Sequence, residues 1–255
     1  GMRAWLLWAL VATAGAVQLQ RRTGGAGRVR PELEGRLLGL LDGLRGRGAG
    51  ASGDARREVQ GVIEELEASR GLPRPVFDER IDGRWKLLYT TNPSSASPIQ
   101  RGFVSSDAVS VFQDVALFNL SASFLPATPT ISNVVSFGPA GRLRVTAKAS
   151  TAAVPLPSFT PRRGDGRILG LNLLGVSETS PPAGAEDSLI DFQFWDAAFE
   201  LNGPLPLAVP YPVPFRLLGD DVKGWIHNTY FSQALRVARG NKGSIFILEK
   251  QGAIS

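Results

Sequence analysis

The first regular pattern along the chain is a pair of helical repeats. Between Glu32 and Leu44, leucines recur at the spacings that place them on one face of a helix. A glycine-rich stretch, 46–53, interrupts the repeat, and a second amphipathic pattern runs from Asp54 to Ala68. The sequence therefore predicts two N-terminal helices that form a hairpin or a pair of lids. The acidic residues of the second helix, Glu64, Glu65 and Glu67, are predicted to lie on its solvated face.

Alternating patterns replace the helical ones after Pro73 and Pro75. Strand-like segments cover residues 85–90, 109–118, 131–137, 142–149, 189–195 and 244–248. The alternation is sharpest in 142–149, where Leu143, Val145 and Ala147 alternate with basic residues and threonine. Such a strand has one dry and one wet face.

This arrangement predicts the fold class. Several antiparallel strands with one dry face, no βαβ rhythm and no internal repeat favour a barrel or a sandwich. Two apolar proline-rich tracts, 154–157 and 204–214, cannot occupy central strands, so they either cover the barrel or touch a membrane. A barrel of about eight strands either fills with side chains or holds one small ligand, and the sequence leaves both cases open.

The N-terminal thirty residues are predicted to be a targeting leader. An apolar run from Ala4 to Ala16 follows Met2-Arg3 and is typical of a signal peptide, a retained membrane anchor being the alternative. The stretch 18–30 is basic, free of acids and transit-like. The two parts resemble the leader used to reach plastids surrounded by extra membranes; ordinary secretion is the alternative. We expect a leader at 1–30, a helical segment at 31–72 and a barrel domain at 73–255.

Charge and composition narrow the function. The net charge of +5 belongs to the leader, which carries five arginines, and the rest has 23 basic and 23 acidic residues. A nucleic-acid partner is therefore not expected. The absence of cysteine excludes disulfides and thiolate sites, and the single histidine, His227, excludes a multi-histidine metal site. No Gly-x-Ser-x-Gly motif occurs, so we predict neither catalytic nor metal-binding residues.

Two stretches carry more specific information than the periodic patterns do. The first is Ile81-Asp82-Gly83-Arg84-Trp85-Lys86-Leu87-Leu88-Tyr89-Thr90-Thr91, and the second comprises 224–231 and 235–248. Together they closely resemble the plastid lipid-associated protein family, also called plastoglobulins or fibrillins, over about Glu32 to Glu249. The resemblance implies a mainly β protein with a lipocalin-like antiparallel β-barrel after an N-terminal helical pair. It also implies a chloroplast or chromoplast location, at thylakoids or plastoglobules.

The resemblance implies roles for particular residues. Gly83-Arg84-Trp85 is similar to the lipocalin Gly-x-Trp signature, so Trp85 would close the barrel floor with Arg236 or Arg239 stacked over it as a cation–π partner. Seven residues are expected to line the interior and contact a ligand: Leu87, Tyr89, Leu143, Val145, Ile190, Phe192 and Phe194. Acidic residues that family members often carry around His227-Asn228 and Ser232-Gln233 are missing here, so no role is carried over to them.

These observations lead to three functional hypotheses. The leading one is a non-enzymatic plastid protein that requires no cofactor and binds or organises a carotenoid, a quinone or another lipid at thylakoids or plastoglobules. The alternative is a structural subunit of a photosystem or antenna complex without a ligand of its own. The third is a lipocalin-like enzyme that acts on an epoxide or isoprenoid, with His227 and a nearby carboxylate as acid and base.

Overall fold

The computed structural model describes residues 27–91, 105–118, 128–161, 180–203, 207–241 and 243–254. The expected leader lies outside these residues except for 27–30. Two α-helices open the described chain, α1 (Pro31–Leu41) and α2 (Gly53–Ser69). The strands that follow are β1 (Gly83–Thr90), β2 (Ser110–Ala116), β3 (Thr130–Ser136), β4 (Gly141–Ser150), β5 (Leu189–Leu201), β6 (Leu207–Pro210), β7 (Lys223–Phe231), β8 (Leu235–Gly240) and β9 (Ile245–Gly252). Short 3-10 turns include η1 (Arg45–Gly48), η2 (Pro75–Phe77), η3 (Glu79–Ile81), η5 (Gly138–Ala140), η6 (Glu186–Ser188), η7 (Phe215–Leu217) and η8 (Gly219–Val222).

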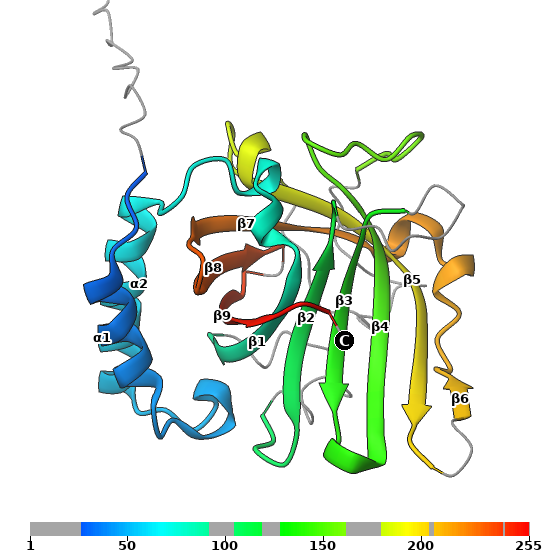
Figure 1. Ribbon diagram of the computed structural model, residues 1–255, viewed down its shortest axis with the longest axis horizontal. Helices are drawn as coiled ribbons and strands as arrows, with labels where there is room; N and C mark the ends of the chain where they lie inside the picture. The colour runs from blue at the N-terminus through cyan, green and yellow to red at the C-terminus, as the bar shows by residue number, and fades with distance from the viewer. Residues whose placement is uncertain are drawn as a thin grey trace, which may run out of the picture.

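The strands form one antiparallel sheet that closes on itself (Figure 1). Neighbouring strands follow the order β4-β3-β2-β1-β9-β8-β7-β5-β6, and β4 also pairs with β5. The β4–β5 pairing joins β1–β5 and β7–β9 into a closed arrangement, which we call the barrel-like ring. The short strand β6 lies on the edge of β5 beyond the stretch that pairs with β7. The expected fold class, mainly β with an N-terminal helical pair, is confirmed.

The inner face of the ring carries the largest apolar cluster. Its buried members come from most strands of the ring: Trp85, Leu87, Val111, Val115, Ile131, Ala147, Ala149, Ile190, Ile226, Phe231, Ala238 and Leu248. In β4 the predicted alternation holds, because Ala147 and Ala149 point inward while Arg142 and Arg144 form ion pairs on the outside. We call this set the inner cluster.

The two helices pack against the outer face of β7, β8, β9 and β1 (Figure 1). Their buried leucine and valine stripes meet a second cluster, which we call the helix-facing cluster: Tyr89, Tyr230, Leu235, Val237, Ile245 and Ile247. The first helix stops at Leu41, earlier than predicted, because Asp42 is extended and Gly43 adopts a positive φ of 81°. The second begins after Ser52, whose hydroxyl accepts a hydrogen bond from the Ala55 amide.

Glu67 corrects the expectation that the acids of the second helix are all solvated. Its side chain is 15% exposed and accepts two hydrogen bonds from Arg239, at 2.7 and 2.6 Å, and a third from the Thr229 hydroxyl at 2.7 Å. A second polar contact joins the other helix to β7, because the Tyr230 hydroxyl donates to Glu34 at 2.5 Å. The amphipathic pattern located the helices but not these partners, which come from strands far along the chain.

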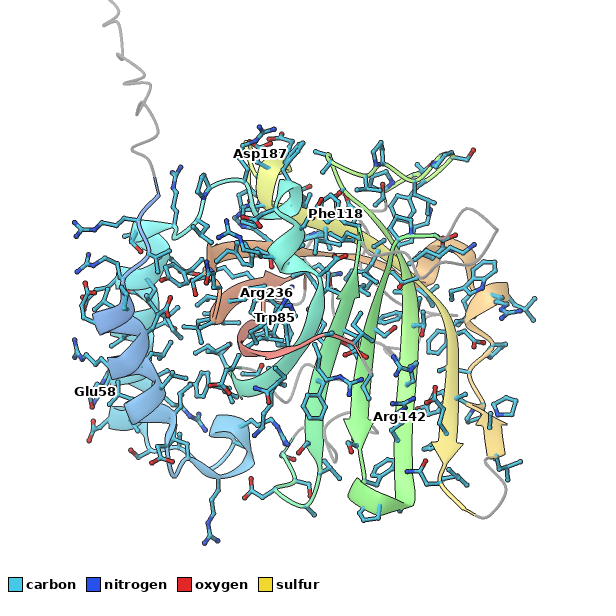
Figure 2. All side chains as sticks on the ribbon, viewed as in Figure 1. Glu58, Trp85, Phe118, Arg142, Asp187 and Arg236 are labelled. Atoms are coloured by element: carbon cyan, nitrogen blue, oxygen red, sulfur yellow. The ribbon has the colours of Figure 1, made fainter. Side chains whose placement is uncertain are left out.

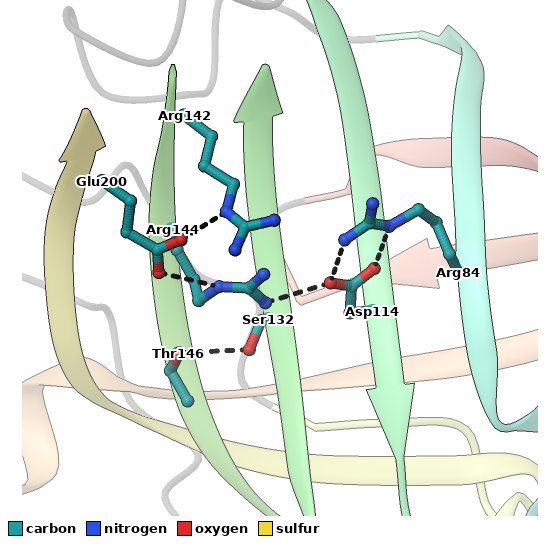
Figure 3. A network of polar contacts seen from close by, with 7 residues as sticks. All are labelled: Arg84, Asp114, Ser132, Arg142, Arg144, Thr146 and Glu200. Carbon is teal, nitrogen blue, oxygen red and sulfur yellow. Dashed lines mark hydrogen bonds and ion pairs between the residues drawn. The ribbon is translucent and has the colours of Figure 1, made fainter. Parts of the chain in front are cut away.

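The outer face of the opposite wall carries a polar network (Figure 3). The buried Asp114 accepts two hydrogen bonds from Arg84, both at 2.8 Å, and one from Arg144 at 3.0 Å. Arg144 also donates to Glu200 at 3.1 Å, and Arg142 forms an ion pair with the same carboxylate. Burial raises the pKa of Glu200, but the two arginines outweigh burial and hold it below its usual value. The network links β1, β2, β4 and β5 across the outside of the ring.

The second proline-rich tract has two structural roles in its described part. Residues 207–210 form the edge strand β6, consistent with the exclusion of proline from central strands. Tyr211, Val213 and Phe215 then pack with Val145 and Phe194 in a third cluster. Tyr211 and Val213 therefore cover the ring, one of the two alternatives that the sequence left open, whereas the residues of β6 are exposed. Among the described helices, none has the length and apolar character that a membrane crossing requires.

Candidate functional site

Trp85 of β1 lies beside Arg236 on the inner face of the ring (Figure 2). Its side chain is fully buried, and its indole nitrogen donates to the Ile81 carbonyl at 2.8 Å. The Arg236 guanidinium lies 5.0 Å from the ring centroid, and the Lys250 ammonium lies 4.5 Å from it. Trp85 therefore carries two cationic neighbours, of which the sequence suggested only Arg236.

Burial sets the electrostatics of both cations. It lowers the pKa of Arg236 to about 9 and that of Lys250 to about 8, with the charge of Arg236 adding to the effect on Lys250. Lys250 donates to the carbonyls of Arg80 and Asp82. Both carboxylate oxygens of Asp82 are occupied by the Leu117 and Phe118 amides, at 2.7 and 2.8 Å. Within the described residues, no carboxylate contacts Arg236, and its Nε and Nη1 atoms are buried without a hydrogen-bond partner.

Two residues expected at this site lie elsewhere. Arg239 occupies the outer face of β8, where it pairs with Glu67, so Arg236 alone of the two arginines stacks on Trp85. Tyr89 belongs to the helix-facing cluster instead of the interior. An extra residue at Leu88 shifts the register between β1 and β9, and this bulge turns Tyr89 toward the helices. Its ring packs so closely on η1 that a side chain at Gly48 would overlap it.

The remaining predicted lining residues lie in or beside the interior. Leu87 and Ile190 belong to the inner cluster, with Phe192 and Phe194 packed against it. Val145 and Phe194 also contact the third cluster, around Phe215, and Leu143 is buried in β4. The two phenylalanines meet edge to face, with ring centroids 5.1 Å apart. Gly224 makes room for one of them, because a Cβ there would lie 2.7 Å from the Phe192 ring.

The inner face is not fully sealed. Five large apolar residues packed against its clusters keep partial solvent exposure: Val135, Val145, Phe192, Phe194 and Phe246. These residues come from β3, β4, β5 and β9, so the accessible apolar surface spans several walls of the ring. Such a lining suits an apolar ligand, because binding would remove this surface from water.

Two polar residues on the inner face were missed by the sequence analysis. Gln113 stands opposite Trp85 and also opposite Asn133, which in turn stands opposite Val145. Directly opposed residues share a face of the sheet, so both amides point inward. Gln113 accepts a hydrogen bond from Arg236 and donates one to Asn133 at 3.3 Å. The alternation Val111-Gln113-Val115 was the available signal, but it does not distinguish an inward amide from a break in the pattern.

His227 lies away from the inner face. It is on the outer face of β7, opposite Arg239, and it lines a cleft together with the end of α2 and residues of the 182–188 segment. A cleft of about 640 Å³ there is lined by His227, Asn228 and Thr229 together with Glu67 and Arg74. Burial lowers the pKa of His227 and so favours its neutral form. The nearby carboxylate, Glu67, is already engaged by Arg239 and Thr229.

These features define the class of the protein: a mainly β protein whose closed antiparallel ring, preceded by a helical pair, surrounds an apolar inner face that carries a few polar side chains. The PAP_fibrillin family matches residues 31–249, and the chain belongs to this family.

Named relatives agree with this assignment. The chain is 39% identical to the probable plastid-lipid-associated protein 12 of Arabidopsis thaliana, over 86% of this chain but only 45% of that protein. It is 26% identical to a chromoplast-specific carotenoid-associated protein of Cucumis sativus, covering 84% of this chain and 67% of the relative. It is 24% identical to plastoglobulin-1 of Pisum sativum, covering 88% and 63%. No solved structure gives a significant match. The relatives are chloroplast or chromoplast proteins, and this chain is a plastid protein.

Proposed function

We propose that the chain is a non-enzymatic carrier that holds an isoprenoid lipid, such as a carotenoid or a quinone, against the inner face of the barrel-like ring at thylakoids or plastoglobules. The observation that carries the proposal is the partial exposure of Val135, Val145, Phe192, Phe194 and Phe246 on or beside that face. The relative named for its association with carotenoids supports the same class of ligand.

Lipid extraction from the purified protein tests this proposal. The full chain is produced in a host that makes carotenoids and quinones, and bound lipids are identified after purification. Val145→Trp should fill the interior and reduce the recovered lipid several-fold. The matched control is Lys86→Trp on β1, because Lys86 lies opposite Phe112 on the outer face and should leave the lipid content unchanged. Lipid-free wild-type protein would overturn the carrier proposal.

A second candidate function rests on a different surface. Leu207 and Leu217 are 57% and 84% exposed, and Val209 lies between them in sequence at 40%. Such exposed apolar residues on an edge strand and the following turn are suited to docking on a thylakoid membrane or on a photosystem or antenna complex. Flotation with galactolipid vesicles, and co-purification with pigment complexes, should then fall in a variant with serine at these three positions. Unchanged flotation and co-purification would exclude this surface while leaving the carrier proposal standing.

A further inference from the structure

A series of hydrogen bonds crosses the inner face from the side of Trp85 toward the partly exposed apolar residues. It begins at Arg236 and runs through Gln113 to Asn133. Asn133 is partly exposed and stands opposite Val145, one of the accessible apolar residues. This series of hydrogen bonds therefore ends at the surface where the ligand of the proposed carrier would lie.

The arginine fixes the direction of every bond in this series. A guanidinium can only donate, so the Gln113 atom that faces Arg236 must be the carbonyl oxygen Oε1. The Gln113 amide nitrogen then points at Asn133, whose oxygen Oδ1 accepts its hydrogen bond at 3.3 Å. The Asn133 nitrogen Nδ2 is left at the free end, and no described residue accepts a hydrogen bond from it.

The charge of Arg236, at the start of this series of hydrogen bonds, strengthens the Asn133 donor at its end. Successive hydrogen bonds that run in one direction polarise one another, and the effect is larger where water is excluded. Arg236 is fully buried, and no described carboxylate neutralises it. Its Nε and Nη1 atoms are themselves buried, so the interior offers a ligand the neutral Asn133 amide and not the guanidinium.

From this geometry we propose that Asn133, oriented by Gln113 and Arg236, is the polar contact of the ligand site and donates a hydrogen bond to a carbonyl oxygen on an otherwise apolar ligand. The proposal rests on the carrier function and narrows its ligand class. An apolar ligand with a quinone or ketone oxygen satisfies Asn133, whereas a pure hydrocarbon would desolvate the amide without replacing its bond to water.

Paired probes of equal chain length test the proposal on the full-length protein. A decyl-substituted benzoquinone presents a carbonyl oxygen, decylbenzene presents none, and binding of each is measured by calorimetry. We expect the quinone to bind about tenfold more tightly than the hydrocarbon, the equivalent of one net hydrogen bond. Asn133→Leu, which removes the donor at similar volume, should abolish this preference by weakening the quinone alone. Asn133→Asp, which replaces the donor by an acceptor, should weaken quinone binding at least as much.

Two controls separate the possible outcomes. Gln193→Leu removes an exposed amide that donates to the Gly219 carbonyl instead of facing the interior, and it should change neither affinity. Decanoate serves as a carboxylate probe, and its binding more tightly than the quinone would overturn the assignment to a neutral carbonyl. Equal binding of quinone and hydrocarbon, unaffected by Asn133→Leu, would overturn the role of Asn133 while the carrier function stands. Binding of no probe would overturn both.

Discussion

Each face of β8 carries one arginine, and the two arginines have opposite electrostatic surroundings. On the outer face, Arg239 meets Glu67 of α2 in a two-pronged ion pair, and apolar residues around it seal the helices to the sheet. On the inner face, Arg236 is more deeply buried, yet in the described residues its partners are only Trp85 and the Gln113 amide. The Glu67 carboxylate balances the charge of Arg239, whereas no described carboxylate balances the charge of Arg236.

This difference separates a structural region from a functional one. A buried charge without a counter-ion is costly, so its retention calls for a role other than stability. The outer face under the helices has the composition of a core, with the Glu67–Arg239 ion pair at its margin. The inner face combines accessible apolar surface with a directed donor, as a binding site requires. The predictions below test this division, beginning with the largest effect.

The outer face should respond to cavity formation as a packed core does. Leu66 of α2 is fully buried in the helix-facing cluster. Leu66→Ala should lower the free energy of unfolding by about 2–5 kcal/mol, because the lost burial adds to the cost of the cavity left behind. Denaturant titration followed by tryptophan fluorescence measures the change. Leu217→Ala is the control, since Leu217 is 84% exposed and its loss should cost less than about 0.5 kcal/mol.

The outer ion pair should come next in size. Glu67→Gln keeps the shape of the side chain but leaves Arg239 without its carboxylate, so we expect a loss of about 1–3 kcal/mol in the free energy of unfolding. Partial exposure of Arg239, at 40%, keeps the effect below that of a fully buried pair. Glu64→Gln changes an exposed acid on the same helix and should be nearly neutral. Equal stability of the two variants would show that the pair does not anchor α2.

The inner arginine should behave differently from the outer pair. Arg236→Met removes the contact with Trp85 and the bond to Gln113, but it also removes a buried charge that no described carboxylate balances. Because these effects oppose one another, the free energy of unfolding should change by less than about 1 kcal/mol or rise. The same denaturant titration measures it. A loss of more than about 2 kcal/mol would mean that Arg236 is a structural residue like Arg239.

The sequence predicted the elements better than the contacts between them. Helices and strands depend on local spacing, so the leucine repeats and the alternation in 142–149 were sufficient to find them. A β-bulge inserts one extra residue into a strand, so the alternation of apolar and polar residues does not reveal it. The extra residue at Leu88 moved Tyr89 to the other face, and an extra residue at Trp195 hid the continuation of β5 to Leu201.

The polar part of the candidate site could not be predicted from the sequence, for a related reason. The inward placement of Gln113 and Asn133 depends on the register of three strands, and the partner of Glu67 lies 172 positions along the chain. The resemblance in Gly83-Arg84-Trp85 did point to Trp85 and Arg236, but it could not choose between Arg236 and Arg239. That choice follows from alternation once the position of β8 in the ring is known.

A dependence of stability on pH should also originate on the inner face. The pKa of Lys250 is lowered from its ordinary 10.5 to about 8, so below pH 8 the lysine is protonated in both the folded and the unfolded chain. Between pH 8 and 10.5 the unfolded chain binds more protons, and the free energy of unfolding therefore rises with pH. Titration at pH 7.5 to 9.5 should show this rise in the wild type and a smaller one in Lys250→Met. Lys86→Met, on the outer face of β1, should keep the full rise. Identical slopes in all three proteins would mean that burial of Lys250 over Trp85 does not disfavour its charge, and the contrast between the two faces would then rest on Arg236 alone.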